Sequence, residues 1–378
     1  MAVLSTPSWL ATGLAASAVL GVVVLQYLLR TRRSKGFPPG PPTLLGIGNL
    51  HQIPLKQPFL QFREWSKTYG DIIGLKIGPT NLVILHNPEH VRELLDRRGA
   101  IYSGRPNSYI PNMVFGKHAD KHVLCMNHGP DLRRWRSAVT YLVGQSGLKQ
   151  TLPMQEATAD TLIHNLLQTP SENLKHIKHW ALATPLLAIT GQQLKDRDEG
   201  FADRFFSAQE EWLKLLEPGT APPVDLFPFL AWVPERFAGW KTKAKQVQTF
   251  MQEEYGGFFE TAKGLKTQDN GEKSAFRSLM TKVMEDRDGQ KEGDIRFSDD
   301  EIAYMGGATL DAAVDTTWAT AMSFVLFMAA YPEAQAKLQE EIDRVCRHQA
   351  PGGDDIKQLP YLRACLFEVS ISSVSLEI

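Results

Sequence analysis

The sequence predicts a mainly α-helical protein with one small β-sheet, joined at its N-terminus to a single transmembrane helix. Three observations support this prediction. Residues 1–29 contain no charged side chain, residues 71–87 have the pattern of two strands, and helical patterns dominate from Ala157 onward. A composition of 43% hydrophobic and 22% charged residues is that of a globular protein and argues against general disorder.

The N-terminal segment predicts an uncleaved signal anchor over residues 1–36. Leu10–Leu29 is an apolar run interrupted by only three polar side chains, and at helical rise it spans about 30 Å, the thickness of a bilayer's hydrocarbon core. The basic segment "RTRRSK" follows and is expected on the cytoplasmic side. The alternative, a cleaved signal peptide, requires a charged start and a shorter apolar core.

Charge and cysteine content narrow the possible partners and compartments. The net charge is −1, which gives no electrostatic basis for binding nucleic acid. The three cysteines, Cys125, Cys346 and Cys365, match no zinc or disulfide spacing. We expect them to be reduced thiols in the cytosol, and no set of metal ligands is predicted.

Short motifs predict several elements between the anchor and the helical part. The proline-rich "FPPGPPTLLGIGN" (37–49) is expected to be a stiff extended spacer. A helix is expected to end at Gly70, followed by two strands joined by a Gly-Pro-Thr-Asn turn. Residues 217–240 form a loop rich in proline and large apolar side chains, which we expect to be either buried or membrane-facing.

One long helix dominates the C-terminal half. A capping box of Ser298 and Glu301 starts it, and no proline interrupts it for about 30 residues. A second membrane span is the alternative, but Asp311 and Asp315 are costly in lipid, and the uncharged run Trp318–Ala330 is short. The sequence therefore predicts a buried core helix.

The middle of this helix carries polar groups among unusually small side chains. The small residues are Gly306, Gly307, Ala308, Ala312, Ala313 and Ala319. Asp315 needs a partner or a proton path, and the Thr316 hydroxyl is placed to bond the carbonyl oxygen of Ala312, one turn back. Taken alone, such a group is more typical of a structural helix crossing than of a catalytic site.

The order of motifs changes that interpretation. "AAVDTT" (312–317) follows the anchor, "FPPGPP", the strand pair and "IYSGRP" (101–106). "DLFPFLAWVP" (225–234) precedes it, and "YPEAQAKLQEEID" and "LPYLRACLFE" (359–368) come after it. In this order, from Phe37 to Glu368, the chain resembles the cytochrome P-450 family in its microsomal, fungal style.

The resemblance implies a haem-thiolate monooxygenase that inserts oxygen from O₂ into a small lipophilic substrate. Its electrons would come from an NADPH-dependent membrane reductase. The expected location is the endoplasmic reticulum membrane, with one span in the lipid bilayer and a domain facing the cytoplasm. A membrane adaptor unrelated to haem is a further alternative, should the motif order be coincidence.

The resemblance also assigns roles to residues. It implies that Asp315 gates protons and that Thr316 hydrogen-bonds dioxygen. Ala312 and Ala313 would lie against the haem, and Ala313 replaces a usual glycine, which narrows the oxygen pocket. Arg136 in "GPDLRRWRSAV" (129–139) would bind a haem propionate, whereas the position of the family's tryptophan is Leu132.

The last residues depart from the family pattern. Glu368 starts a Glu-x-x-Arg motif, but residue 371 is Ile371 instead of arginine, and none of the three cysteines lies in the family's glycine-rich ligand loop. We therefore expect a partial family domain over residues 37–368 and a non-family tail over residues 369–378. The competing interpretation is a non-catalytic, membrane-anchored fragment without the axial cysteine, and it is the one favoured for this polypeptide.

Overall fold

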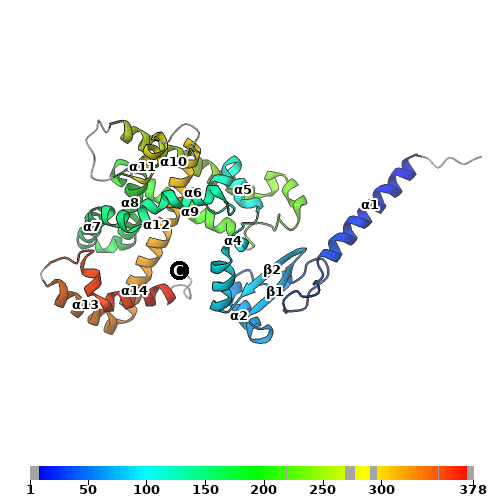
Figure 1. Ribbon diagram of the computed structural model, residues 1–378, viewed down its shortest axis with the longest axis horizontal. Helices are drawn as coiled ribbons and strands as arrows, with labels where there is room; N and C mark the ends of the chain where they lie inside the picture. The colour runs from blue at the N-terminus through cyan, green and yellow to red at the C-terminus, as the bar shows by residue number, and fades with distance from the viewer. Residues whose placement is uncertain (1–7, 218, 269–276, 290–295, 348, 373–378) are drawn as a thin grey trace, which may run out of the picture. The chain divides into compact units, whose positions relative to one another are not determined.

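The computed structural model describes residues 8–217, 219–268, 277–289, 296–347 and 349–372 of the 378-residue chain (Figure 1). They form two compact units. The first comprises Met1–Gly104 and Lys214–Thr242, and the second comprises Arg105–Leu213 and Lys243–Ile378. The described residues are mainly helical with one two-stranded sheet, as predicted.

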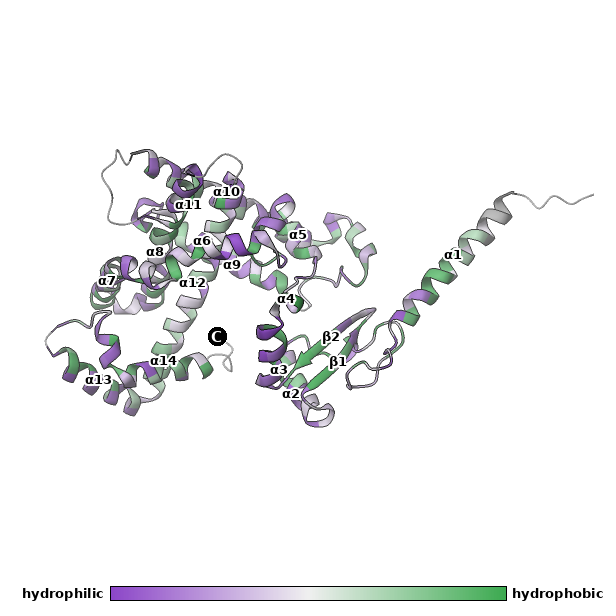
Figure 2. Cartoon of the chain, viewed as in Figure 1, coloured by the Kyte–Doolittle hydropathy of each residue, from purple (hydrophilic) through white to green (hydrophobic). Residues whose placement is uncertain are grey.

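The first unit begins with the predicted apolar helix, α1 (Ser8–Arg30). The hydropathy colouring of Figure 2 marks much of this helix as hydrophobic. The end of the helix is fixed to the following segment, because the hydroxyl of Tyr27 donates to the carbonyl oxygen of Gly46 (2.9 Å) and the amide of Gly46 donates to Thr31 Oγ1 (3.1 Å). α1 is therefore anchored at its C-terminal end only, among the described residues.

The proline-rich segment is hydrogen-bonded to the sheet and is more than a linker. The guanidinium of Arg33 donates to the carbonyl oxygens of Pro38 (2.8 Å), Pro41 (3.0 Å) and Gly74 (2.7 Å). Asn49 is fully buried, and its Oδ1 accepts from the amide of Lys76 (2.9 Å). Prolines lack amide donors, so these side chains supply the hydrogen bonds that hold the segment in place.

The sheet is the predicted hairpin, but its connection is Gly78-Pro79 alone, because Thr80 and Asn81 of the predicted turn belong to the second strand. β1 (Ile72–Ile77) pairs antiparallel with β2 (Thr80–Leu85), with Ile72 opposite Leu85 and Ile77 opposite Thr80. α2 (Pro58–Tyr69) precedes it and ends at Gly70, as predicted. After the hairpin, α3 (Pro88–Val91) continues as a π-helix (92–97), and α4 (Gly99–Tyr102) follows.

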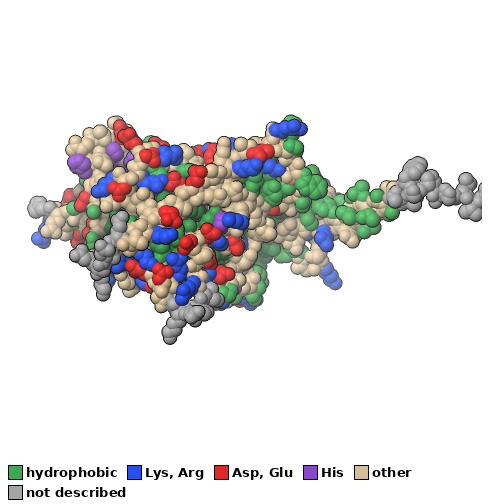
Figure 3. Space-filling view, turned by 90° about the horizontal axis from the view of Figure 1, so that it is seen from above, with side chains coloured by type: hydrophobic (Ala, Val, Ile, Leu, Met, Phe, Trp, Pro, Cys, Tyr) green, Lys and Arg blue, Asp and Glu red, His purple; other side chains and the backbone are tan. Residues whose placement is uncertain are grey.

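The apolar loop of residues 217–240 belongs to this first unit and is exposed. It contains the short 3-10 helices η6 (Pro228–Trp232) and η7 (Glu235–Phe237). Phe229, Trp232 and Phe237 each expose more than half of their surface. Hydrophobic side chains also gather around the base of α1 in Figure 3. Of the two expectations for this loop, burial is wrong for these three residues.

The second unit is a helical assembly around α12 (Asp299–Ala330). The helices along the chain are α5 (Tyr109–Phe115), α6 (Pro130–Val143), α7 (Gln145–Gln168), α8 (Asn173–Thr190), α9 (Phe201–Leu216), α10 (Gly239–Gln268), α11 (Leu279–Asp288), α13 (Pro332–Cys346) and α14 (Pro360–Ser372). α8 packs along α12, and α7 packs on α8. Buried aromatic side chains of α9 and α10, including Phe205 and Phe258, fill the core.

The ends of these helices follow the sequence signals. Ser298 and Glu301 make the predicted capping box at the start of α12. α13 and α14 begin at Pro332 and Pro360, which occupy first-turn positions that need no amide donor. The first turn of α14 gains a further cap from buried Glu341, whose carboxylate accepts from the amides of Tyr361 and Leu362 at 3.0 Å.

α12 is only partly the buried helix that the sequence predicts. Its residues from Ile302 to Ala308 are buried, as is Leu310, but beyond Val314 the only fully buried residue is Ser323. Its length and composition would also allow it to cross a membrane, a test that long core helices pass as well. The expectation of burial is correct for the first turns and wrong for the C-terminal half.

Candidate active site

The small residues of α12 serve two different purposes. A Cβ atom at Gly306 would lie 2.6 Å from the sulfur of Met280 on α11, and one at Gly307 would overlap the ring of Tyr255 on α10. Neither position has room for a side chain. The two glycines therefore allow close helix packing, and this is the structural role that small residues most often have.

Beyond Leu310 the small residues are partly or fully exposed. Ala312 and Thr316 are exposed, and Ala313 is partly exposed. As predicted, the Thr316 hydroxyl donates to the carbonyl oxygen of Ala312 (2.8 Å). The Thr320 hydroxyl makes the same bond to the carbonyl oxygen of Thr316, also at 2.8 Å. Two consecutive turns of α12 thus present hydroxyl groups at an exposed surface.

Asp315 stands beside these hydroxyl groups and is half-buried. Burial raises the pKa of its carboxyl group. The structure gives it no hydrogen-bond or ion-pair partner among the described residues. An acid with a raised pKa and no fixed partner is suited to taking up and releasing a proton.

An apolar groove of about 460 Å³ runs along the exposed half of α12. Thr316, Thr317 and Thr320 line it from α12, while α7, α8 and α14 contribute apolar side chains such as Leu166, Ile177 and Leu366. The hydroxyl-bearing turns of α12 therefore border an apolar groove, which suits binding of a largely apolar molecule.

A third polar group on α12, the carboxyl group of Asp311, has buried partners that are distant in sequence. The Tyr255 hydroxyl donates to the carboxylate of Asp311, and Gln209 of α9 is hydrogen-bonded to the same carboxyl group. Burial raises the pKa of Asp311 to about 7, although both hydrogen bonds act to lower it. Sequence analysis did not include Asp311 among the site residues; an acid four residues before Asp315 was the available signal.

On α6, the predicted propionate-binding residue is accessible. The side chain of Arg136 is exposed and has no partner among the residues that the structure describes. Leu132 is buried. Trp135 shares the helix face of Leu132, and its indole nitrogen is buried without a hydrogen-bond partner in the described part of the chain. Sequence analysis missed Trp135, which offers a donor next to Arg136.

The three cysteines lie in different places and favour the thiol form. Cys125 follows the 3-10 helix η3 (Gly116–Lys121), Cys346 ends α13, and Cys365 is on α14. Burial raises the pKa of each thiol. None of them has an environment that stabilises a thiolate, such as a neighbouring cation.

The end of the chain is helical up to Ser372. Val369 is buried, so residues 369–372 of the segment expected to be a tail complete α14, and residues 373–378 lie outside the described part. Glu368 and Cys365 line a cavity of about 420 Å³ with the start of α13 and the end of α12. Ile371, which stands where the family motif has arginine, is exposed.

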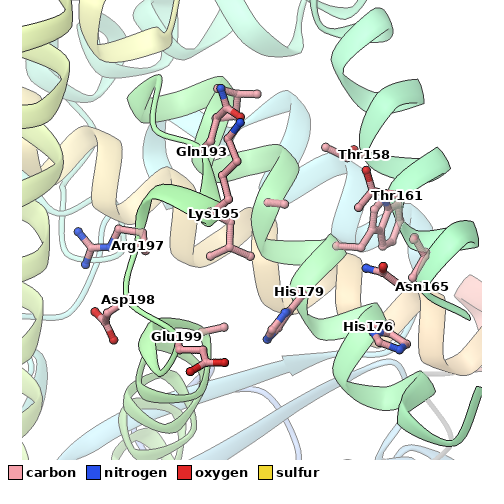
Figure 4. Close-up of a pocket in the computed structure, with 16 residues that line it drawn as sticks. Thr158, Thr161, Asn165, His176, His179, Gln193, Lys195, Arg197, Asp198 and Glu199 are labelled. Atoms are coloured by element: carbon pink, nitrogen blue, oxygen red, sulfur yellow. The ribbon is translucent and has the colours of Figure 1, made fainter. Parts of the chain in front are cut away.

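A separate cavity of about 610 Å³ lies between α7, α8 and the segment that leads into α9 (Figure 4). His176 and His179 reach it from α8, and Lys195 and Glu199 reach it from the segment 193–199. Burial lowers the pKa of His179, which favours the neutral form of its imidazole. None of the predicted site residues lines this cavity.

Comparison with known proteins gives one consistent family. The family model described as cytochrome P-450 matches residues 38–369. The cytochrome P-450 monooxygenase atE of Aspergillus terreus is 31% identical over 94% of this chain and 65% of its own length. A cytochrome P-450 monooxygenase of Arthrobotrys oligospora is 32% identical over 89% of this chain and 62% of its own length.

A solved structure shows the same fold. A zebrafish cytochrome P-450 with progesterone matches with a TM-score of 0.66 at 18% identity, over 82% of this chain and 69% of that chain. The chain spans less than two thirds of the length of the first curated relatives it matches. The match of the family model over most of the sequence shows that this chain belongs to the cytochrome P-450 family, whose cofactor is haem.

Proposed function

We propose that the protein acts as a haem-dependent monooxygenase that inserts oxygen from O₂ into a small lipophilic substrate. Electrons would come from an NADPH-dependent membrane reductase. One observation carries the proposal: the exposed half of α12 presents half-buried Asp315 and the Thr316 hydroxyl beside an apolar groove. Membership of the family supplies the reaction class.

Two features of the described residues fit a bound haem. The small side chains of Ala312 and Ala313 leave the surface of α12 open to a flat apolar group. Arg136 has a guanidinium without a described partner, and the indole N–H of Trp135 is a buried donor without one. An arginine and an indole donor suit the carboxylates of haem propionates. We propose Arg136 and Trp135 as propionate-binding residues.

When bound, the haem supplies the chemistry of dioxygen activation. For the protein's own residues we propose a division of roles between Asp315 and Thr316. Asp315 takes up a proton from solvent, since its carboxyl is half-buried and has a raised pKa. Thr316 orders that proton at the exposed surface of α12, because its hydroxyl can donate to Ala312 or to a bound molecule.

The cysteines do not fit the axial position. We propose that none of Cys125, Cys346 and Cys365 ligates iron, because burial favours the thiol form of each. The reduced carbon-monoxide difference spectrum of the purified 378-residue chain tests this. We expect no red-shifted band of the thiolate-ligated type. A band of near-stoichiometric intensity would overturn the proposal, and single Cys→Ser variants would identify the ligand.

We also propose membrane attachment in the endoplasmic reticulum, with residues 1–36 as anchor and residues 37–368 as the family domain on the cytoplasmic side. The apolar helix α1 and the exposed side chains of Phe229, Trp232 and Phe237 support attachment. The full chain should resist carbonate extraction from membranes, whereas a chain starting at Lys35 should be released. Extraction of the full chain by carbonate contradicts an anchor.

The role of Thr316 applies to a haem-loaded form of the protein that includes an axial cysteine ligand, and it is tested there by comparing two threonines. Thr316→Ala should continue to consume reductant while releasing oxygen as peroxide, because the hydroxyl that orders the proton is lost. Thr320→Ala is the matched control, since Thr320 makes the same backbone hydrogen bond one turn further along. Equal coupling of reductant to product in both variants would remove Thr316 from the mechanism.

A further inference from the structure

The base of α1 carries three cations that have no role in the chemistry proposed above. Arg30, Arg32 and Lys35 are exposed and have no hydrogen-bond or ion-pair partner among the described residues. We propose that these three side chains, here called the basic collar, bind the headgroups of anionic phospholipids. The inference rests on the proposed membrane attachment and adds a lipid preference to it.

The sequence around the basic collar is positively charged throughout. Residues 1–63 contain no Asp or Glu, although the whole chain has a net charge of −1. The first acidic residue, Glu64, is paired with Lys67 at 2.8 Å. A cluster of cations directly after an apolar helix attracts anionic lipids, which are concentrated in the cytoplasmic leaflet of membranes. The proposed topology places the basic collar on that side of the membrane.

The structure separates the basic collar from the fourth cation of the same segment. The guanidinium of Arg33 donates to the carbonyl oxygens of Pro38, Pro41 and Gly74 at 2.7–3.0 Å. These donors are therefore used within the protein, where they hold the proline-rich segment against the sheet. Arg33 is a structural residue, and only the three exposed cations are left to contact a headgroup.

The basic collar is held where the apolar helix ends. Thr31 Oγ1 accepts from the amide of Gly46 (3.1 Å), and the Tyr27 hydroxyl donates to the carbonyl oxygen of the same glycine (2.9 Å). The amide of Phe37 donates to the carbonyl oxygen of Ser34 (3.1 Å), which closes a turn around Lys35. Because the backbone of the basic collar is fixed in this way, little ordering of the chain opposes headgroup binding.

Exposed apolar side chains lie in the loop that contacts the end of α1. Leu44 and Leu45 expose 52% and 57% of their surface and directly precede Gly46. Two backbone hydrogen bonds between Leu44 and Gly48 (3.0 and 2.8 Å) hold this loop in shape. Apolar groups that enter the interface, next to cations that contact headgroups, are the combination that binds an anionic membrane surface. An acidic protein or a nucleic acid would use the cations but not the leucines.

Electron spin resonance of the full chain in phosphatidylcholine vesicles tests the basic collar. The probe is a trace of spin-labelled phosphatidylserine, compared with spin-labelled phosphatidylcholine. Lipids in contact with the protein are immobilised, so the immobilised fraction of each label gives its relative association. We expect phosphatidylserine to be favoured on the order of fivefold, the effect of one cation near a membrane surface. Salt at about 0.5 M should remove most of this preference.

Two double variants locate the preference. Arg32→Gln with Lys35→Gln retains the hydrogen bonds of Arg33 and should lower the preference to less than about twofold. Lys149→Gln with Lys337→Gln is the matched control, because both lysines are exposed and have no partner among the described residues. This control should leave the preference unchanged. Resistance of each variant to carbonate extraction verifies that its anchor is intact.

The outcomes separate the lipid preference from the membrane attachment on which it rests. Equal immobilisation of both lipids by the unmodified chain refutes the basic collar and leaves the anchor in place. An equal loss of preference in both double variants also refutes it, because the preference would then follow total charge. If neither lipid is immobilised, the anchor and the basic collar are both wrong. The salt dependence of the unmodified chain requires no variant to fold.

Discussion

The two halves of α12 differ in what surrounds them. From Ile302 to Leu310 the helix is packed against α10 and α11, and two glycines admit the side chains of Met280 and Tyr255. Beyond Leu310 most residues of the same helix, whose course is seen in Figure 1, are partly or fully exposed, and they include hydroxyl groups and Asp315. Small residues thus mark close packing in one half and an accessible surface in the other.

This difference shows that a helix can be held rigidly at one end while its other end presents polar side chains for a reaction. The first half is fixed by the capping box and by the Tyr255–Asp311 hydrogen bond. The second half keeps its polar groups free of side-chain partners among the described residues. Asp311 lies at the boundary, with a carboxyl group that belongs to the packed half.

The largest expected effect is the pH dependence that Asp311 gives to stability. Its pKa rises from 3.8 to about 7 on folding, so the folded state binds the proton more tightly. The stabilisation is complete below pH 3.8 and is lost as pH rises through 7, about 4 kcal/mol in all. Asp311→Asn should flatten this part of the curve of unfolding free energy against pH. An unchanged slope would contradict a proton on Asp311.

Adding a side chain in the packed half of α12 should have the next largest effect on stability. Gly307→Ala places a methyl group into the ring of Tyr255 and should lower the free energy of unfolding by about 1–3 kcal/mol. Gly256→Ala on α10 is the control, since no atom lies within 4 Å of its added Cβ, and it should raise stability by about 0.5–1 kcal/mol. Chemical denaturation measures both; equal effects would mean that Gly307 does not govern packing.

The first turn of α14, the helix that borders the exposed half of α12, depends on Glu341 for its cap. Glu341→Gln replaces the carboxylate that accepts from the amides of Tyr361 and Leu362, and should cost about 1 kcal/mol of stability. Glu340→Gln, the exposed neighbour, should change the free energy of unfolding by less than about 0.5 kcal/mol. If the two variants denature alike, the cap on α14 is not a source of stability.

The smallest effect on stability is expected in the exposed half itself. Thr316→Ala removes a hydroxyl that bonds only its own helix at an exposed position, so the change should be within about 0.5 kcal/mol. Thermal unfolding followed by circular dichroism measures it. A loss of more than about 2 kcal/mol would show that Thr316 belongs to the packed structure and would undermine its proposed chemical role.

Much of the fold was predictable because its signals are local. The hairpin of β1 and β2, the end of α2 at Gly70 and the capping box of α12 each depend on residues a few positions apart. The bond from Thr316 to Ala312 is predictable for the same reason, as it lies within one turn. The roles assigned to Asp315, Thr316, Ala312, Ala313 and Arg136 stay predictions.

The amino-acid sequence by itself determined the mainly helical character of the chain, the ends of some helices such as α2 and the start of α12, and the order of motifs that places the chain in its family. Only the tertiary structure decided which small residues are packed and which are open, because that depends on the neighbouring helix. The tertiary structure also decided the raised pKa of Asp311. Its partner Tyr255 is 56 residues away, and the shift of its pKa arises from burial, which no local pattern specifies.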